Sequence, residues 1–296
     1  MSGASIEKLQ RVQSLVRRSL FAAVLATCSH AAMRAVTFPH TATVAAVENL
    51  THDTKRMRFR VDKGQTLRFS AGQFVMLSVP EKFVQKWNSR YKTSHTEIAR
   101  PYSFASSPSR LPLFDLIVKL AGPPPGKDVP PGVASSYVHQ LNVGDSVRFS
   151  HPAGSLSASV DTGRPLIMAA GGTGVAPFLS FFQSWFESDV PHRSRIYLFF
   201  GVRSRRDLFL HDQFRSWAST RKDFTYIPAL SHPADADAWS GETGYINVVL
   251  DKHIGAPSDA DAFVAGSPAM LREVQKVLIS KGITQERIQH DPISVQ

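Results

Sequence analysis

A continuous apolar run over residues 165–170 leads directly into a turn with three glycines. The run reads PLIMAA, and the turn that follows reads GGTGVAP, ending at Pro177. A short apolar run that ends in a glycine turn before a helical pattern is typical of a strand in a parallel sheet, buried on both faces. Glycines let backbone amides approach a phosphate closely, and the positive end of the next helix favours an anion. The turn is therefore a candidate phosphate site, although a tight strand–helix turn that binds nothing fits the same residues.

The pattern of apolar residues and turn residues changes near residues 155–163. Before this point, short β-rich runs are separated by turn residues, which is typical of a small antiparallel barrel. After it, fully apolar strands alternate with helical runs, which favours a doubly wound parallel sheet with helices. We therefore expect an antiparallel, Greek-key-like β-barrel domain over residues 39–157 and an α/β domain over residues 158–296.

Residues 1–38 differ from the rest because they hold five basic residues against Glu7 alone. Apolar residues three and four apart over residues 9–18 predict one helical face. An Arg-rich, acid-poor, amphipathic start is typical of a mitochondrial transit peptide, and a helix lying on the domain is the alternative. We expect a mitochondrial protein if this leader is a transit peptide and a cytoplasmic one otherwise. No apolar run reaches the ~20 residues that a bilayer span needs.

Cysteine and charge narrow the classes of function further. Cys28 is the only cysteine in the 296 residues, which excludes a disulfide framework, a thiolate zinc cage and a cysteine-held iron–sulfur cluster within this chain. The 34 Lys and Arg against 24 Asp and Glu give a net charge of +10, which favours anionic partners. Nucleic acid is not expected, since no basic stripe interleaved with aromatic residues occurs.

Six short motifs follow one another along the chain. They are Arg100-Pro101-Tyr102-Ser103, Gly132-Val133-Ala134-Ser135-Ser136-Tyr137, the glycine turn over residues 171–177, Gly201-Val202-Arg203-Ser204-Arg205-Arg206-Asp207, Trp239-x-Gly241-x-x-Gly244-Tyr245 and Ala265-Gly266-Ser267-Pro268-Ala269-Met270. In this order and spacing they resemble the ferredoxin–NADP reductase superfamily, and within it the flavin reductases of the cytochrome-b5-reductase and bacterial oxygenase-reductase kind. The resemblance covers about residues 40–291.

The resemblance implies an FAD-dependent NAD(P)H oxidoreductase, with Tyr102 and Ser103 as its catalytic candidates. Tyr102 would stack on the flavin ring, and Ser103 would hydrogen-bond near flavin N5. The remaining residues implied at the FAD are Arg100, Pro101, Val118, Lys119, Gly132, Val133, Ala134 and Ser135. Those implied at the nicotinamide dinucleotide are Gly172, Thr173, Gly174, Pro177, Gly266, Ser267, Pro268 and Met270. No metal is expected.

The loop Arg203-Ser204-Arg205 is rich in cations and hydroxyls, which favours the 2′-phosphate of NADPH, and NADH stays the alternative. Two departures from the family pattern stand out. Ala265 occupies the place of a usual cysteine, which implies slower hydride transfer. The end of the chain lacks the aromatic residue that often shields the flavin, which puts that shielding in doubt.

These departures motivate a second hypothesis, a flavin- or dinucleotide-binding sensor with little turnover. If the chain is an enzyme, its electrons must pass to a separate one-electron acceptor of the ferredoxin or cytochrome type, because nothing in the chain carries them further. Four cations, Lys82, Lys86, Arg90 and Lys92, lie in a polar insertion over residues 81–99. They would suit an acidic carrier protein, or they form an exposed solvated loop.

Overall fold

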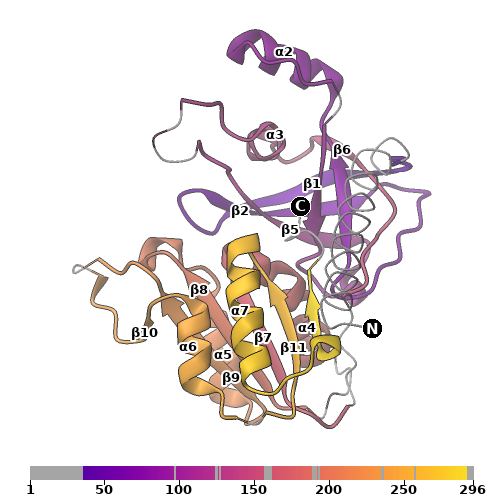
Figure 1. Cartoon of the computed structure of the whole chain (residues 1–296). Coiled ribbons are helices and arrows are strands. Elements are labelled where there is room, and N and C mark those ends of the chain that lie inside the picture. Colours follow the sequence, from indigo (N-terminus) through magenta and orange to yellow (C-terminus); the bar gives the residue numbers. More distant parts are fainter. Residues whose placement is uncertain are drawn as a thin grey trace, which may run out of the picture. The chain divides into compact units, whose positions relative to one another are not determined.

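The computed structural model describes residues 36–96, 98–123, 126, 128–156, 162–188, 192, 194–234, 237–256 and 258–291. The helical face expected over residues 9–18 lies outside these residues and stays a prediction. Residues 38–296 form one compact unit, and Figure 1 shows its two sheets.

The first sheet is antiparallel and is built from the β-rich runs of the first half. Its strands are β1 (His40–Asn49), β2 (Thr54–Val61), β3 (Phe74–Ser78), β4 (Ala99–Ser103), β5 (Leu113–Lys119) and β6 (Ser146–Phe149), in the order β4-β3-β6-β1-β2-β5. In β2 the side chains of Met57, Phe59 and Val61 alternate with arginines, so that one face is buried and the other is not. A bridge between Phe104, directly after β4, and Leu116 of β5 joins the two edges of the sheet, so that it curls into a small barrel.

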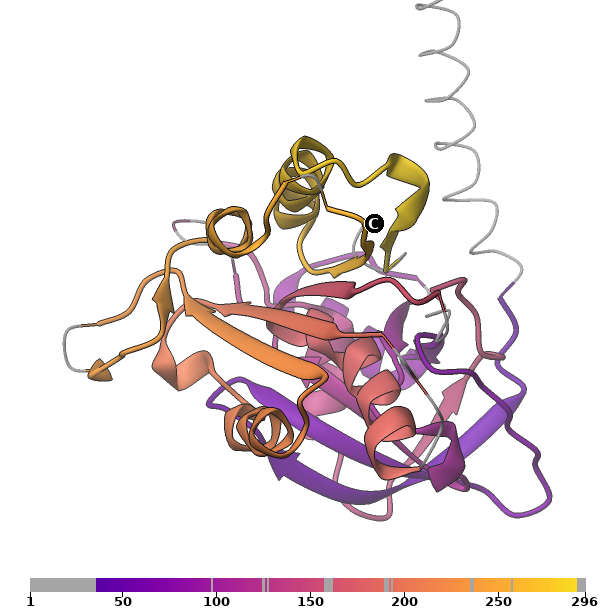
Figure 2. The ribbon, with the colours of Figure 1, turned by 90° about the horizontal axis from the view of Figure 1, so that it is seen from below.

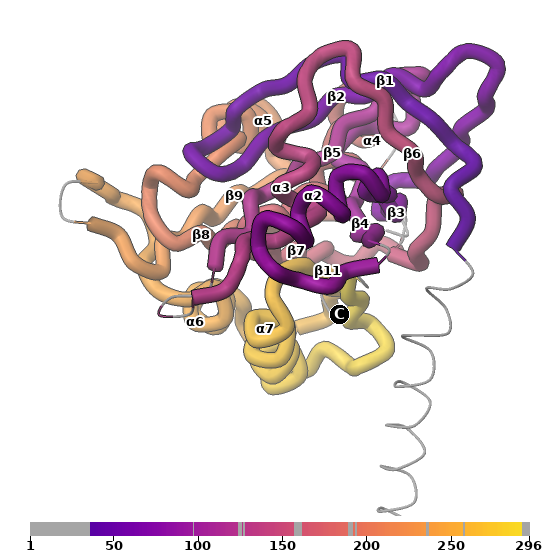
Figure 3. The backbone as a smooth tube through the Cα atoms, turned by 90° about the horizontal axis from the view of Figure 1, so that it is seen from above, coloured from indigo at the N-terminus to yellow at the C-terminus, as the bar shows by residue number. Residues whose placement is uncertain are grey.

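The polar insertion is a helix in the structure. Helix α2 (Glu81–Tyr91) connects β3 to β4, and α3 (Val133–Gln140) follows β5. Phe83 of α2 meets Tyr137 of α3 edge-on at 5.2 Å between ring centroids, and Trp87 is 6% exposed. Figure 3 shows the two helices beside each other. The aromatic side of α2 is therefore held by packing, and its polar side faces outward.

The second sheet is parallel throughout. Its strands are β7 (Leu166–Gly171), β8 (Ile196–Val202), β9 (Phe224–Leu230), β10 (Glu242–Thr243), β11 (Asp261–Ala265) and β12 (Ile288–His290), in the order β10-β9-β8-β7-β11-β12. Its helices are α4 (Ala176–Glu187), α5 (His211–Thr220), α6 (Ile246–His253) and α7 (Pro268–Ser280), with the short turns η2 (Gly172–Val175), η3 (Arg205–Asp207) and η5 (Gln285–Arg287). A further short turn, η1 (Pro108–Arg110), lies between β4 and β5 of the first sheet.

Helices cover both faces of this sheet, as Figures 1 and 2 show. Side chains of α4 and α5 share one core with Met168 of β7, whereas those of α6 and α7 share another with Ile167 on the opposite face. Phe178 and Phe182 of α4 are completely buried, and burying each such side chain contributes ~1.5–3 kcal/mol. The expected fold class, a barrel followed by a doubly wound parallel sheet, is confirmed. Among the described residues, no helix has both the length and the apolar character that crossing a membrane requires.

Candidate functional site

The carboxyl ends of the parallel strands meet at one edge of the second sheet, where α/β proteins bind their ligands. β7 ends at Gly171, β8 at Val202 and β11 at Ala265. Three of the six motifs, those that begin at Gly171, Gly201 and Ala265, follow these strands, so residues that lie far apart in the sequence converge at this edge. Two cavities open there, and both are lined by Gly171, Thr173 and Ser267.

The larger cavity has a volume of about 570 Å³ and lies over the ends of the parallel strands. Its predicted lining residues are Gly172, Thr173, Arg203, Ser267 and Met270, and Lys119 lines it from the barrel. Lys119 therefore lines the cavity at the end of the second sheet, whereas the resemblance implied that it lines the FAD site. An elongated ligand with phosphate groups fits a space of this size, in which the cations Lys119 and Arg203 and the glycine amides would meet the phosphates. Two carboxylates, Asp207 and Glu273, line the same cavity.

The smaller cavity, of about 280 Å³, lies where the barrel meets the second sheet. The barrel contributes Pro101, Tyr102, Ser103 and Ile117, and the second sheet contributes Gly174 and Gly266 among others. It has an aromatic wall, and glycines face it. The structure thus brings together the two catalytic candidates and the glycine turn.

Gly172 and Gly174 of the turn are glycines for two different physical reasons. Gly172 has a positive φ of 54° with open space around it, so its backbone conformation selects glycine. A Cβ on Gly174 would lie 2.3 Å from the carbonyl oxygen of Ala265, so this residue is glycine because β11 passes against it. The turn is therefore shaped by its neighbour strand and not only by a ligand.

A buried hydroxyl–carboxylate pair lies in the smaller cavity. The hydroxyl of Ser103 donates to Oδ2 of Asp291 at 3.1 Å, and the two residues are 7% and 3% exposed. Burial raises the pKa of the neighbouring Tyr102 to about 12, even though the charge of Arg100 acts in the opposite direction. Tyr102 is accordingly a neutral ring at any working pH, which suits stacking.

The remaining predicted residues line neither cavity. Val118 lies in the barrel core and Val133 and Ala134 are buried in α3. Arg100 is exposed and donates to the carbonyl of Ala99. The hydroxyl of Ser135 closes the loop before α3, because it accepts from the amide of Ala121 and donates to the carbonyl of Gly132.

Four more of the predicted residues lie at the start of a helix or make hydrogen bonds within a loop. Pro177 and Pro268 lie in the first turns of α4 and α7, where proline is well placed. The hydroxyl of Ser204 donates to Asp207 at 2.6 Å, and Arg205 donates to the carbonyl of Asp237. Of the three loop residues expected at a 2′-phosphate, Arg203 alone lines the larger cavity.

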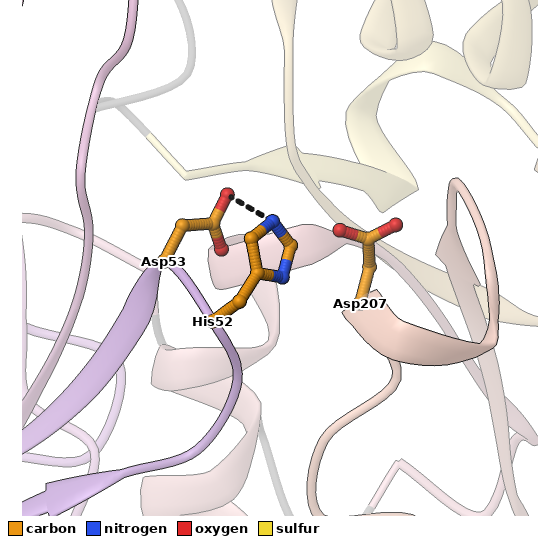
Figure 4. Close-up of side chains that lie close together, drawn as sticks. All are labelled: His52, Asp53 and Asp207. Carbon is orange, nitrogen blue, oxygen red and sulfur yellow. Dashed lines mark ion pairs between the residues drawn. The ribbon is translucent and has the colours of Figure 1, made fainter.

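A cluster of ionisable groups lies at the rim of the larger cavity. Figure 4 shows His52 between Asp53 of the barrel and Asp207 of η3, with ligand atoms within 4.8 Å of one another. Asp53 already has a cation, because the ammonium of Lys119 lies 3.1 Å from its carboxylate. Although burial acts to raise it, the pKa of Asp53 is lowered by hydrogen bonds from Lys119, Thr54 and Thr51. We interpret the cluster as an ion-paired rim and assign no metal to it.

Asp291 was missed in the sequence, as were Thr54, Ser231, Tyr245 and Asn247, which line the larger cavity. A signal for Asp291 exists, since it directly follows β12. The rule that ligands bind at the carboxyl ends of parallel strands would have selected it. For Thr54, at the start of a barrel strand, we find no such signal.

Two family models match consecutive parts of the chain. Residues 41–157 match the oxidoreductase FAD-binding domain, and residues 168–276 match the oxidoreductase NAD-binding domain. The chain belongs to the ferredoxin–NADP reductase superfamily. The resemblance seen in the six motifs is thereby confirmed, and the cofactor classes are FAD and a nicotinamide dinucleotide.

Relatives include one component of the Na(+)-translocating NADH-quinone reductase in two bacteria. The chain is 32% identical to the protein of Serratia proteamaculans (strain 568) over 259 residues, which is 80% of this chain and 63% of that protein. It is also 32% identical over 268 residues to the protein of Neisseria meningitidis strain FAM18, which is 83% of this chain and 66% of that protein. The chain thus spans less than two thirds of the length of these relatives.

Solved structures share the fold. The Amycolatopsis cytochrome P450 reductase GcoB aligns with a TM-score of 0.68 at 24% identity, over 87% of this chain and 71% of that one. The flavohem-like FAD/NAD-binding domain of nitric oxide dioxygenase from Vibrio cholerae aligns with a TM-score of 0.70 at 19% identity, over 86% of this chain and 98% of that one. Identities this low show the fold alone.

The residues present fit a bound flavin. The smaller cavity offers a neutral aromatic wall in Tyr102 and a buried hydroxyl–carboxylate pair in Ser103 and Asp291. A planar ring with polar atoms on its edge needs these groups. Arg100 projects from the same strand into solvent, where its guanidinium would pair with the pyrophosphate of FAD.

Proposed function

We propose that this chain is an FAD-dependent NAD(P)H reductase that passes electrons to a separate one-electron acceptor. The observation that supports it best is the junction of the two cavities. Gly171, Thr173 and Ser267 line both, so a dinucleotide in the larger cavity can reach a ring in the smaller one.

When bound, FAD would supply the redox chemistry, namely acceptance of a hydride from C4 of NAD(P)H, with NAD(P)⁺ as the product, and delivery of the two electrons one at a time. The residues of the chain would position the two cofactors. Tyr102 covers one face of the ring site, and Ser103 offers a hydroxyl whose orientation is fixed by Asp291. The amides of the turn over residues 171–174 and the ammonium of Lys119 would hold the phosphates of the dinucleotide.

The experiment that tests the proposal is reduction of the purified, FAD-loaded chain by NADPH and by NADH. Bleaching of the flavin absorbance in a stopped-flow instrument, followed by turnover with ferricyanide, is the expected result. A protein that binds flavin but is reduced by neither dinucleotide would instead support the sensor hypothesis.

For the dinucleotide we propose NADPH as the preferred donor, with NADH as the alternative that the names of the relatives favour. The support for NADPH is Arg203, an exposed cation in the lining of the larger cavity. Replacing Arg203 with glutamine should lower kcat/KM for NADPH ~10-fold, since a hydrogen bond between charged groups contributes ~1.5–3 kcal/mol. The same value for NADH should change little.

The control for this prediction is Arg206→Gln, because Arg206 is also exposed but lines neither cavity. Equal losses with both dinucleotides in Arg203→Gln would show that this arginine does not distinguish them. The preference for NADPH would then be abandoned.

For the acceptor we propose an acidic carrier that docks on the outer face of α2. Lys82, Lys86 and Arg90 are exposed and lie four residues apart along that face. Among the described residues, none of the three is in an ion pair within 4.0 Å. Like charges at this spacing destabilise an isolated helix, so an acidic partner would relieve their repulsion.

Reversing the three charges of α2 to glutamate should lower the rate of electron transfer to an acidic ferredoxin or cytochrome b5 ~10-fold at low salt, because steering depends on complementary charge. Reduction by NAD(P)H should not change. The matched control reverses Lys63, Arg68 and Lys222, which are equally exposed elsewhere. Equal losses in the two triple variants would point to net charge and would remove α2 as the docking site.

For residues 1–38 we propose mitochondrial targeting, supported only by their basic, amphipathic composition. A fluorescent fusion to these residues should be imported by mitochondria. A diffuse cytosolic signal would contradict the proposal.

A further inference from the structure

The contact between α4 and the barrel contains a row of buried hydroxyl groups. The hydroxyl of Ser180 donates to the carbonyl of Ser106 at 2.7 Å. The hydroxyl of Ser184 lies 2.8 Å from the carbonyl of Ser180 in its own helix and 3.1 Å from the hydroxyl of Ser107. The side-chain carbonyl of Gln183 accepts from the amide of Ser107 at 3.2 Å. All five residues are at most 9% exposed. Residues 106 and 107 of the barrel thus make polar contacts with three positions on one face of α4, at 180, 183 and 184.

Each side of this contact is directly connected to one part of the proposed site, the barrel side to Ser103 and α4 to the glycine turn. The segment over residues 105–107 directly follows Phe104, which follows Ser103 at the end of β4. Helix α4 begins at Ala176, directly after the glycine turn, and Ala176 and Gly174 line the smaller cavity. A shift of α4 relative to residues 105–107 would therefore change the separation between the glycine turn and Ser103.

The rest of the contact cannot set that separation as sharply. Ala105, Ile117 and Leu156 share an apolar core with α4 residues such as Phe181, and apolar attraction is not directional. Hydrogen bonds fix distance and angle, and a slide of the helix would leave buried hydroxyls and a backbone carbonyl without partners, which is destabilising. The apolar core holds the domains together, and the hydroxyl row holds them in one register.

We propose that Ser180, Gln183 and Ser184 are positioning residues for hydride transfer, which set the distance between the nicotinamide turn and the flavin edge at Ser103. The inference rests on the proposed reductase function. These side chains touch neither cavity, and they act through residues 105–107 and the glycine turn. A displacement of 1 Å in such a geometry costs ~10²-fold in rate, so a partial loosening is measurable.

The test uses the FAD-loaded full chain with Ser180→Ala and, separately, Gln183→Met. In each variant the limiting rate of flavin reduction at saturating NAD(P)H should fall about 10-fold, whereas the Kd of the dinucleotide changes little. The Tm should fall by several degrees, because one buried backbone group loses its partner. The primary isotope effect with deuterated NAD(P)H should become more dependent on temperature, because the transfer distance is less fixed. The control is Ser194→Ala, since Ser194 is 1% exposed and its hydroxyl has no hydrogen-bond partner among the residues that the structure describes.

A second readout does not need activity. Spin labels at Arg60→Cys in the barrel and Lys222→Cys in the second domain, both exposed, report the distance between the domains once Cys28 is replaced by serine. Ser180→Ala and Gln183→Met should broaden the distance distribution, and Ser194→Ala should not. If the distance distributions of Ser180→Ala and Gln183→Met kept their width, the proposal would be overturned, whether or not the chain is a reductase. Broadened widths with an unchanged reduction rate would overturn it as well.

Discussion

Replacing Gly174 with alanine should lower kcat/KM for flavin reduction by NAD(P)H by two orders of magnitude or more. The added Cβ would lie 2.3 Å from the carbonyl oxygen of Ala265 and 2.9 Å from the amide nitrogen of Gly266. Both neighbours are backbone atoms, which cannot rotate away as a side chain can. The turn must therefore move away from β11, and its amides leave the wall that the two cavities share.

The measurement is stopped-flow reduction of the FAD-loaded variant over a range of dinucleotide concentrations. Flavin content should stay close to that of the unaltered chain, because the barrel contributes the ring wall. The control is Gly255→Ala, which meets nothing within 4 Å and has no positive φ. If Gly174→Ala were reduced at the unaltered rate, the glycine turn would not be the dinucleotide site.

Replacing Ser103 with alanine should lower the limiting rate of flavin reduction ~10²-fold, the lower end of what a positioned proton-bearing group contributes. The substitution removes the hydroxyl at the ring site and also the donor to Asp291, whose carboxylate is 3% exposed. Because the loss lies in the chemical step, kcat should fall and the KM for the dinucleotide should not rise.

Two further variants give this prediction its controls. Ser103→Thr keeps a hydroxyl and should retain most of the rate, whereas Asp291→Asn keeps the size of the side chain but removes its charge, and should lower the rate by a comparable factor. A full rate in Ser103→Ala, or a loss that Ser103→Thr shares equally, would show that the hydroxyl takes no part.

The sequence determined the fold class and the order of the domains, because both follow from the local spacing of apolar residues along the chain. Short alternating runs become the barrel strands, and the apolar run at 165–170 becomes the buried strand β7 with its glycine turn. The glycine turn was found for the same reason, because it follows the apolar run. Tyr102, Ser103 and Met270 were implied by the family resemblance, and all three line a cavity together with Thr173 of the turn.

The tertiary structure decided which residues meet across the chain. Asp291 lies 188 residues from Ser103 in sequence, yet the two share a hydrogen bond, because β12 joins the sheet beside β11. Lys119 lines the larger cavity, and the hydroxyl of Ser204 donates to Asp207 within its own loop. The serines of α4 meet the barrel only once both domains are packed. Local pattern fixes which element forms and which face it buries, but a contact between distant side chains exists only after the sheets and helices have closed.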